Sequence, residues 1–290
     1  MHDGSRRSIR HFINIFADKY LPMIPTNDVE PDTLLTVAEF YDALAPDYDT
    51  MTGFQKRFVH EKPFFRLLVE KYKIRTALDA GCGTGFHSLL LAQLGVQVMA
   101  IDVSPAMIAE VQKHAHELNL NINAVLSSFS DLNRIEGLRF DAVFTMGNSL
   151  AHLLSDEEIR SSLDCFASIL NPNGILFMQN LNYDRILARK ERIQSIKEVD
   201  DKTFIRFYDY TDHLLTFNVL TIARDAGIVR QNLQSVQLRP IRSAELSAMM
   251  LSSQFGDIKL LGSIGLEDYS PTTSKDLVLL ARKKHNEGLR

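Results

Sequence analysis

Three glycines, at positions 81, 83 and 85, stand between two acidic residues, Asp79 and Asp102. Glycine has no Cβ, so a turn built on glycines lets the backbone come close to a ligand. A carboxylate such as that of Asp102, at the end of a later apolar stretch, can accept hydrogen bonds from both hydroxyls of a ribose. Ligands of open parallel sheets bind where such strands end. The spacing therefore predicts a nucleoside cofactor site on a strand, a turn and a helix.

Two nucleoside cofactors compete for this arrangement. A dinucleotide site has the spacing GxGxxG, which places a pyrophosphate at the N-terminus of the helix. The third glycine of that pattern is absent here, because position 86 is Phe86. Asp79 would repel a pyrophosphate but suits the amino group of a cationic methionine moiety. The pattern favours S-adenosylmethionine over a nicotinamide dinucleotide.

Together these motifs resemble the class I S-adenosylmethionine-dependent methyltransferases over residues 37–283. The resemblance implies that Asp79 and the three glycines hold the methionine end of the cofactor and that Asp102 holds the ribose. It also implies a seven-stranded sheet whose last strand is antiparallel. Tyr41-Asp42 and Tyr48-Asp49 are similar to a pre-motif of this family in which a tyrosine helps cover the cofactor.

The residues expected to bind the cofactor come from the pre-motif, the glycine turn and the ends of the following strands. They are Tyr41, Tyr48, Asp79, Gly81, Cys82, Gly83, Gly85, Asp102, Val103, Met107, Ser128, Phe129, Met146 and Gly147. Many relatives carry an acid where Ser128 stands, near the adenine. Phe129 could instead stack on the base or offer its backbone N–H. For Ser128, Phe129 and Tyr48, packing alone is the alternative.

Two further stretches predict where a methyl acceptor binds. Residues 147–153 and Asn182-Tyr183-Asp184 resemble the glycine N-methyltransferase-like branch of the family. Asn148 is expected to orient the acceptor through its side-chain carbonyl. His152 is expected to hydrogen-bond the cofactor or take a proton, and Tyr183 to line the acceptor pocket. For His152 and Tyr183, a role in capping or packing is equally open.

Leu181 departs from that branch, which has an arginine two residues before the tyrosine to grip the acceptor's carboxylate. Leucine cannot pair with a carboxylate, so the sequence does not favour glycine as the acceptor. Arg185 and Arg206 are candidate substitutes. A small amine, an amino-acid-like molecule and an unrelated small molecule all remain open.

The function expected is methyl transfer from S-adenosylmethionine to nitrogen or oxygen of a small molecule by in-line displacement. Such a reaction needs alignment and exclusion of water more than acid–base catalysis. The alternatives are a nicotinamide-dependent oxidoreductase and a catalytically silent protein that binds S-adenosylmethionine.

The elements that would position these residues follow from alternating apolar patterns. Strands are predicted at 76–79, 96–101, 122–126, 140–146 and 175–179, with helices at 86–94, from 105, and at 155–170. Residues 37–73 read as helical with an interruption at Pro46, and 171–174 as a turn. This predicts an α/β fold, a three-layer Rossmann-like sheet of seven mostly parallel strands. Strands near 258–261 and 276–281, after a helix over 243–254, would complete it.

Residues 203–238 instead alternate in the manner of three antiparallel strands, with a hairpin turn at Ala226-Gly227. This antiparallel insertion (lid) follows the fifth strand. The division predicted is a leader over 1–36, a methyltransferase domain over 37–290 and a lid insertion over about 184–240. A short amphipathic helix is expected over 8–21, packing on the domain or on a dimer partner, with a membrane-surface helix as the weaker alternative.

Composition and charge limit the classes of binding partner that the sequence predicts. The 290 residues carry a net charge of −4 and a pI of about 6.1, so no nucleic-acid partner is expected. His114 and His116 are expected on a solvated surface, and no metal site is predicted. The two cysteines, outside any metal-ligand pattern, favour a reduced, cytoplasmic compartment. No apolar run is long enough to predict a membrane span. A homodimer is a further possibility.

Overall fold

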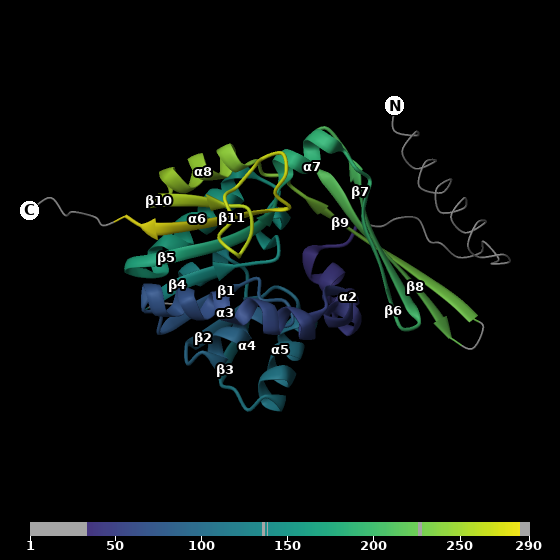
Figure 1. Ribbon diagram of the computed structural model, residues 1–290, viewed down its shortest axis with the longest axis horizontal. Coiled ribbons are helices and arrows are strands. Elements are labelled where there is room, and N and C mark those ends of the chain that lie inside the picture. Colours follow the sequence, from purple (N-terminus) through teal and green to yellow (C-terminus); the bar gives the residue numbers. More distant parts are fainter. Residues whose placement is uncertain (1–33, 135–136, 138, 226–227, 285–290) are drawn as a thin grey trace, which may run out of the picture.

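The computed structural model describes residues 34–134, 137, 139–225 and 228–284. They form two sheets, of seven and four strands. Figure 1 shows the seven-stranded sheet between helices, and the four-stranded sheet beside it with helix α2 in the gap. The helix predicted over residues 8–21 and the turn at Ala226-Gly227 lie outside the described residues.

The seven-stranded sheet has the order β10-β11-β5-β4-β1-β2-β3. Neighbours from β3 to β5 are parallel, and β11 runs antiparallel to both β5 and β10. The strands are β1 (Thr76–Ala80), β2 (Gln97–Asp102), β3 (Ile122–Leu126), β4 (Phe140–Thr145), β5 (Leu170–Leu181), β10 (Phe255–Leu261) and β11 (Asp276–Lys283). The prediction of a mostly parallel seven-stranded sheet with one reversed strand is confirmed.

Helices cover both faces of this sheet and complete the three layers. One face packs against α3 (Phe54–Tyr72), α4 (Phe86–Gln93) and α5 (Pro105–Glu117). The other packs against α6 (Asp156–Ile169) and α8 (Ser243–Ser252). Short 3-10 helices η1 (Ser130–Arg134) and η2 (Ser149–His152) follow β3 and β4. A capping box at Ser155 begins α6, and Ser104 with Pro105 begins α5, both as predicted.

The predicted break at Pro46 is wrong. Helix α2 (Val37–Thr52) runs through Pro46 and ends at Gly53, whose φ of 76° is left-handed, and α3 starts directly after it. Proline removes one backbone hydrogen bond and does not by itself end a helix that is packed on several sides. The buried residues Phe40, Leu44 and Met51 hold α2 on both sides of the proline.

The turn predicted at 171–174 is also wrong as a boundary. Strand β5 starts at Leu170, which pairs with Phe140, and its register against β4 shifts before Ile175. Asn173 has a φ of 64°. The polar residues therefore form an irregularity inside the strand, as a bulge does.

The smaller sheet, here called sheet B, is antiparallel in the order β6-β7-β8-β9. Its elements follow α7 (Tyr183–Arg189) and are β6 (Ile193–Val199), β7 (Lys202–Tyr210), β8 (Leu215–Asp225) and β9 (Ile228–Leu238). The sequence predicted three of these strands and missed β6. The inner face of sheet B packs on α2 through Phe204, Val219 and Val236.

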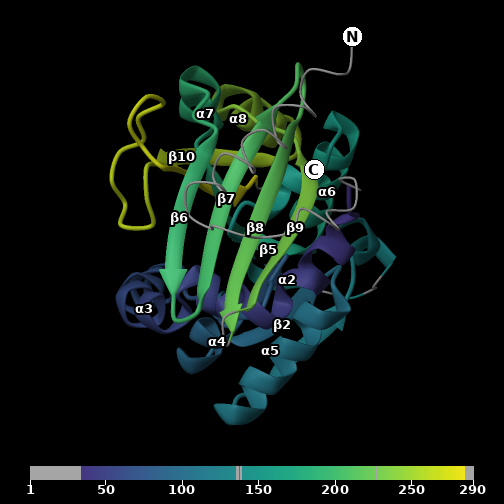
Figure 2. The same ribbon diagram turned by 90° about the vertical axis from the view of Figure 1, so that its right-hand side faces the viewer.

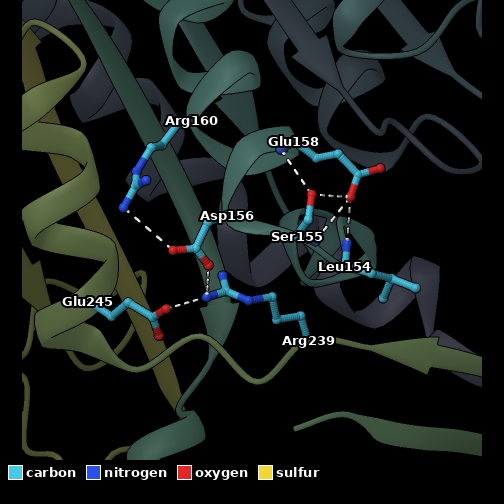
Figure 3. Close-up of polar contacts among 7 residues, drawn as sticks. All are labelled: Leu154, Ser155, Asp156, Glu158, Arg160, Arg239 and Glu245. Atoms are coloured by element: carbon cyan, nitrogen blue, oxygen red, sulfur yellow. Dashed lines mark hydrogen bonds and ion pairs between the residues drawn. The ribbon is translucent and has the colours of Figure 1, made fainter.

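Arg239 fixes the point where the chain returns from sheet B to the larger sheet. Its guanidinium lies 2.5 Å from the Asp156 carboxylate and also pairs with Glu245 on α8 (Figure 3). Its backbone N–H donates to the carbonyl of Ala151 in η2. The N-terminus of α6, η2 and α8 are thereby tied to the end of β9.

No helix in the described ranges combines the length and apolar character that crossing a membrane requires.

Candidate functional site

The glycine turn joins β1 to α4 and has little room for side chains. Gly81 has a φ of 75°, and a Cβ at that position would lie 2.6 Å from the hydroxyl of Ser149. Gly83 has a φ of 54° and donates its N–H to Asp102 at 2.9 Å. The turn therefore requires glycine for its backbone conformation and, at Gly81, for close packing as well.

Asp79 lies at the end of β1, 1% exposed beneath the turn. One of its carboxylate oxygens accepts a hydrogen bond from Ser88 at 2.6 Å, and the other is buried with no hydrogen-bond partner. Burial raises the pKa of this carboxyl. A buried acceptor with an unused oxygen fits a cationic or N–H donor group bound nearby.

Asp102 ends β2 and faces the turn. Its two oxygens accept hydrogen bonds from the backbone N–H groups of Gly83 and Ser104, at 2.9 and 3.0 Å. Burial raises its pKa, against the lowering effect of these N–H groups. Each oxygen keeps a second lone pair, so the fixed carboxylate can still accept two ribose hydroxyls.

A cavity lies next to the glycine turn. Most of the residues predicted to bind the cofactor line it: Tyr41, Tyr48, Gly81, Cys82, Gly83, Asp102, Val103, Ser128, Phe129, Met146 and Gly147. Asp79, Gly85 and Met107 are not among its lining residues. Gly85 packs on Val111, and Met107 is fully buried with its N–H bound to Ser104. Arg57, Thr84, Ser149 and Leu153 line the cavity and were not predicted.

Two aspartates of α2 fasten this helix over the cavity. Asp42 accepts hydrogen bonds from the Ser104 hydroxyl and the Ala106 N–H, at the N-terminus of α5. Asp49 accepts the hydroxyl of Thr84 at 2.6 Å. Its other oxygen lies 3.2 Å from Nε2 of His114.

His114 is therefore not a solvated surface residue, and that prediction is wrong. Its Nδ1 lies 3.0 Å from the Thr84 carbonyl, and 16% of its side chain is exposed. The polar spacing of α5 could not reveal this, because the partners come from α2 and the glycine turn.

A second cavity adjoins the first and opens toward sheet B. The two share Tyr41, Tyr48, Thr52, Arg57, Gly147 and His152 as walls. The second is also lined by Asn148, by Leu181 and by Arg206 and Tyr208 of sheet B. A ligand in the first cavity and a ligand in the second would thus meet at these shared residues.

Both polar atoms of the Asn148 side-chain amide form hydrogen bonds. Its Oδ1 accepts the backbone N–H of Leu181 at 3.0 Å, and its Nδ2 donates to the Tyr183 hydroxyl at 2.8 Å. Tyr183 is 1% exposed and is not among the residues that line either cavity. The structure places Tyr183 behind Asn148, where it fixes the amide.

His152 contacts Tyr41 across the shared wall. Its Nε2 lies 2.8 Å from the Tyr41 hydroxyl, and its Nδ1 is buried without a partner. Burial lowers the pKa of His152 to about 4 and raises that of Tyr41 well above its usual value. Both groups are therefore neutral at pH 7.

Four charged residues line the second cavity. Arg57 and Glu61 form an ion pair at 2.8 Å, and His87 lies 3.3 Å from Glu61. Asp276 hydrogen-bonds Gln179, and burial raises its pKa. Arg206 donates from Nε to Ser195 at 2.7 Å. Among the described residues neither Asp276 nor Arg206 has an ion-pair partner within 4 Å.

The site described above lies in a part of the chain that is similar to known proteins. Residues 77–174 match the methyltransferase domain family. In sequence, these residues are similar to a methyltransferase domain. The match spans the glycine turn, Asp102 and Asn148, and it confirms the resemblance to class I methyltransferases.

Relatives of known activity match part of the chain. A glycine/sarcosine N-methyltransferase of Aphanothece halophytica is 34% identical over 149 residues, which are 51% of this chain and 56% of that protein. The glycine N-methyltransferase of Mus musculus is 28% identical over 184 residues, covering 54% of this chain and 63% of that protein. The chain thus spans less than two thirds of the length of these relatives.

Solved structures share the fold over more of the chain. An S-adenosylmethionine-dependent methyltransferase from Clostridium acetobutylicum superposes with a TM-score of 0.73 at 14% identity, covering 84% of this chain and 99% of that one. A sugar N-methyltransferase from Streptoalloteichus superposes with a TM-score of 0.64 at 19% identity, covering 91% and 99%. The chain therefore shares the Rossmann-like fold of these proteins over most of its length.

Proposed function

We propose that the chain transfers a methyl group from S-adenosylmethionine to nitrogen or oxygen of a small molecule. The observation that carries this proposal is the meeting of the two cavities at Tyr41, Tyr48, Gly147 and His152. The first cavity offers a glycine turn and a ribose-binding carboxylate. The second offers polar walls of the size a small molecule needs.

The bound cofactor would supply an electrophilic methyl group on a sulfonium, whose departure leaves a neutral thioether. The chain's own residues then have to align the acceptor and keep water out. Tyr41 and Tyr48 form an aromatic wall between the cavities, with ring centroids 6.0 Å apart. Asp102 would fix the ribose, and the unpartnered oxygen of Asp79 would hold the amino group of the methionine moiety.

Asn148, His152 and Tyr183 take different parts in this scheme. Asn148 lines the second cavity, and its carbonyl oxygen retains one lone pair for the acceptor. Tyr183 serves as a positioning residue for Asn148. His152 is neutral and bonded to Tyr41, which supports a role in orienting Tyr41 or the acceptor. Its low pKa makes it a weak proton acceptor at pH 7.

The acceptor is proposed to be a polar small molecule, since unpaired polar groups face the second cavity. Leu181 lines it where the relatives' branch would have an arginine, and Arg206 supplies a cation from β7 instead. Arg185 is not among the lining residues. Asn180 has a buried side-chain oxygen without a partner, which suits an N–H donor. The relatives named for glycine and sarcosine support an amine acceptor.

The two alternatives have less support. The glycine spacing and the buried Asp79 disfavour a pyrophosphate and so a nicotinamide-dependent oxidoreductase. A silent binding protein would not need an acceptor cavity joined to the cofactor cavity. A cytoplasmic location, the absence of a nucleic-acid partner, a homodimer and the division into a leader, domain and lid remain proposals from the sequence.

Incubation with S-adenosylmethionine labelled on its methyl group tests the proposed activity. The acceptors are paired: glycine with ethanolamine, and β-alanine with 3-aminopropanol, followed by a cell extract. We expect a labelled small-molecule product. If Arg206 binds the carboxylate of the acceptor, the carboxylated member of each pair should be methylated faster. Binding of the cofactor without any labelled product would favour the silent protein.

A further inference from the structure

Sheet B has an outer face that turns away from α2 and the cavities. The outer face is made of the side chains of Ile205, Phe207, Leu220, Ile222 and Leu233. They form one apolar cluster across three strands, in which Ile205 pairs with Leu220 and Leu220 with Leu233. Strand residues alternate between faces, so Arg206 and Tyr208 between them point to the second cavity.

No described helix or loop lies over this outer face. In Figure 2 the four strands of sheet B face the viewer, and every described helix lies behind or beside them. The side chains of this outer face are apolar, so a segment that covered them would remove apolar surface from water.

The chain itself contains a segment long enough to cover this face. The described residues start at Leu34, and the N–H of Leu35 donates to the carbonyl of Ser235 on β9 at 3.0 Å. Strand β9 is an edge strand of sheet B. The residues from 22 to 33 can reach about 40 Å when extended, at roughly 3.3 Å per residue. Any segment before them can therefore reach every part of the outer face.

The sequence of that segment matches an apolar surface. Apolar side chains recur at Ile9, Phe12, Ile13, Phe16 and Tyr20, the spacing of one face of an amphipathic helix. Polar residues occupy most of the opposite face. Ile15 and Leu21 are apolar residues that fall outside the apolar face.

We propose that residues 8–21 pack as an amphipathic helix on the outer face of sheet B of the same molecule. Sheet B would then be held between two helices, with α2 on its inner face. This inference concerns the fold of the lid and stands whether or not the proposed methyl transfer does.

Glutamate substitutions in the full chain test which face of the segment is buried. Phe12→Glu places a charge on the apolar face, and Ile15→Glu is the matched control on the opposite face. We expect Phe12→Glu to speed hydrogen exchange at least tenfold in residues 204–222 and to lower the melting temperature by about 4 °C or more. Ile15→Glu should change neither. Equal effects of the two variants would overturn the proposal.

Cross-linking identifies the occupant without relying on a destabilised variant. Ile13→Cys is combined in turn with Ile205→Cys, Leu220→Cys and Ile222→Cys, with Ile13→Cys alone as the control. A disulfide within one chain in at least one pair is the expected result. A disulfide that joins two chains would overturn the proposal in favour of a second copy. No disulfide in any pair would also overturn it.

Discussion

At the scale of the residue, Asp79 and Asp102 show how position decides chemistry. Burial raises the pKa of both carboxyls. Backbone N–H groups of Gly83 and Ser104 stabilise the charge of Asp102, whereas Asp79 has only the Ser88 hydroxyl and one unused oxygen. Asp102 is thus a preformed acceptor for neutral hydroxyls, and Asp79 is suited to a cation.

Gly81→Ala tests whether the turn depends on close packing. The new methyl group would meet Ser149 at 2.6 Å, so we expect the variant to lose cofactor binding at least tenfold. Gly95→Ala is the control, since Gly95 also has a positive φ, of 85°, but no atom within 4 Å of the new Cβ. Calorimetry with S-adenosylhomocysteine measures both. Equal losses would mean that backbone strain, not crowding, explains the turn.

Tyr183→Phe tests whether Tyr183 acts through Asn148. The variant removes the hydroxyl that accepts from Nδ2 of Asn148 and leaves the aromatic packing in place. We expect kcat to fall roughly tenfold, with an unchanged Kd for S-adenosylhomocysteine. In an Asn148→Ala background the same change should have almost no effect on kcat. Additive effects of the two substitutions would show that Tyr183 acts independently.

The pKa of His152 predicts a pH dependence of stability. Its pKa is about 4 in the folded state and 6.5 in the unfolded chain, so the unfolded chain binds more protons between these values. The free energy of unfolding therefore rises with pH through this window, and the contribution of His152 is lost as pH falls from 6.5 toward 4. The full effect is about 3 kcal/mol.

His152→Gln isolates this contribution. Thermal unfolding is followed from pH 7 to pH 4 for the wild type, for His152→Gln and for His213→Gln, which alters an exposed histidine. The melting temperature of His152→Gln should fall less on acidification than that of the wild type. The control should follow the wild type. A His152 variant that follows the wild type would show that this histidine is not buried in the neutral form.

At the scale of the element, α2 is the joint between the two sheets. Asp42 and Asp49 tie it to the methyltransferase domain. On the other side, Lys202 of β7 pairs with Asp47 at 2.5 Å, and Lys197 of β6 donates to the carbonyls at the C-terminal end of α2. Because Tyr41 and Tyr48 lie on the same helix, these contacts also set the wall between the cavities.

Asp49→Ala tests the attachment of α2 to the glycine turn. It removes the contacts with Thr84 and His114, and hydrogen bonds to a charged group contribute about 1.5–3 kcal/mol each. We expect the Kd for S-adenosylhomocysteine to rise about tenfold. Asp47→Ala, which releases α2 from sheet B only, should change it less than twofold. If calorimetry shows that Asp47→Ala weakens binding more than Asp49→Ala does, the contact of α2 with sheet B, and not its contact with the glycine turn, closes the cofactor cavity.

Local signals explain what could be predicted at this scale. The strands of the larger sheet are short apolar runs, and the caps at Ser104 and Ser155 act within one helical turn, so both could be read from sequence. Strand β6 is rich in polar residues, and its pairing with β7 gives it structure. The continuation of α2 through Pro46 likewise depends on packing against sheet B. Such long-range contacts leave no local pattern.

The same distinction holds for the candidate site. Residues in the glycine turn and at strand ends were predictable because the topology brings strand ends together. Arg57 reaches both cavities from a helix whose placement no motif encodes, whereas Arg206 was named from the sequence only as one of two substitutes for a missing arginine. Met107 is fully buried and is not among the residues that line the first cavity.

At the scale of the whole molecule, the two sheets contribute different parts of the candidate site. The larger sheet carries the glycine turn, and sheet B with α2 lines the second cavity, in which we propose that the acceptor binds. The shared wall lies where both parts meet. The proposed acceptor would therefore bind between two sheets whose relative position depends on the contacts of α2 and Arg239.

The central claim is that the turn and Asp102 bind S-adenosylmethionine. Calorimetry of the wild type and of Asp102→Ala with S-adenosylmethionine, S-adenosylhomocysteine and NAD tests it most directly, with Asp164→Ala as a control for an exposed carboxylate. The account predicts that both sulfur ligands bind the wild type and NAD does not. It also predicts that Asp102→Ala weakens binding by about 1.5–3 kcal/mol. Binding of NAD alone, or unchanged affinity in Asp102→Ala, would contradict it.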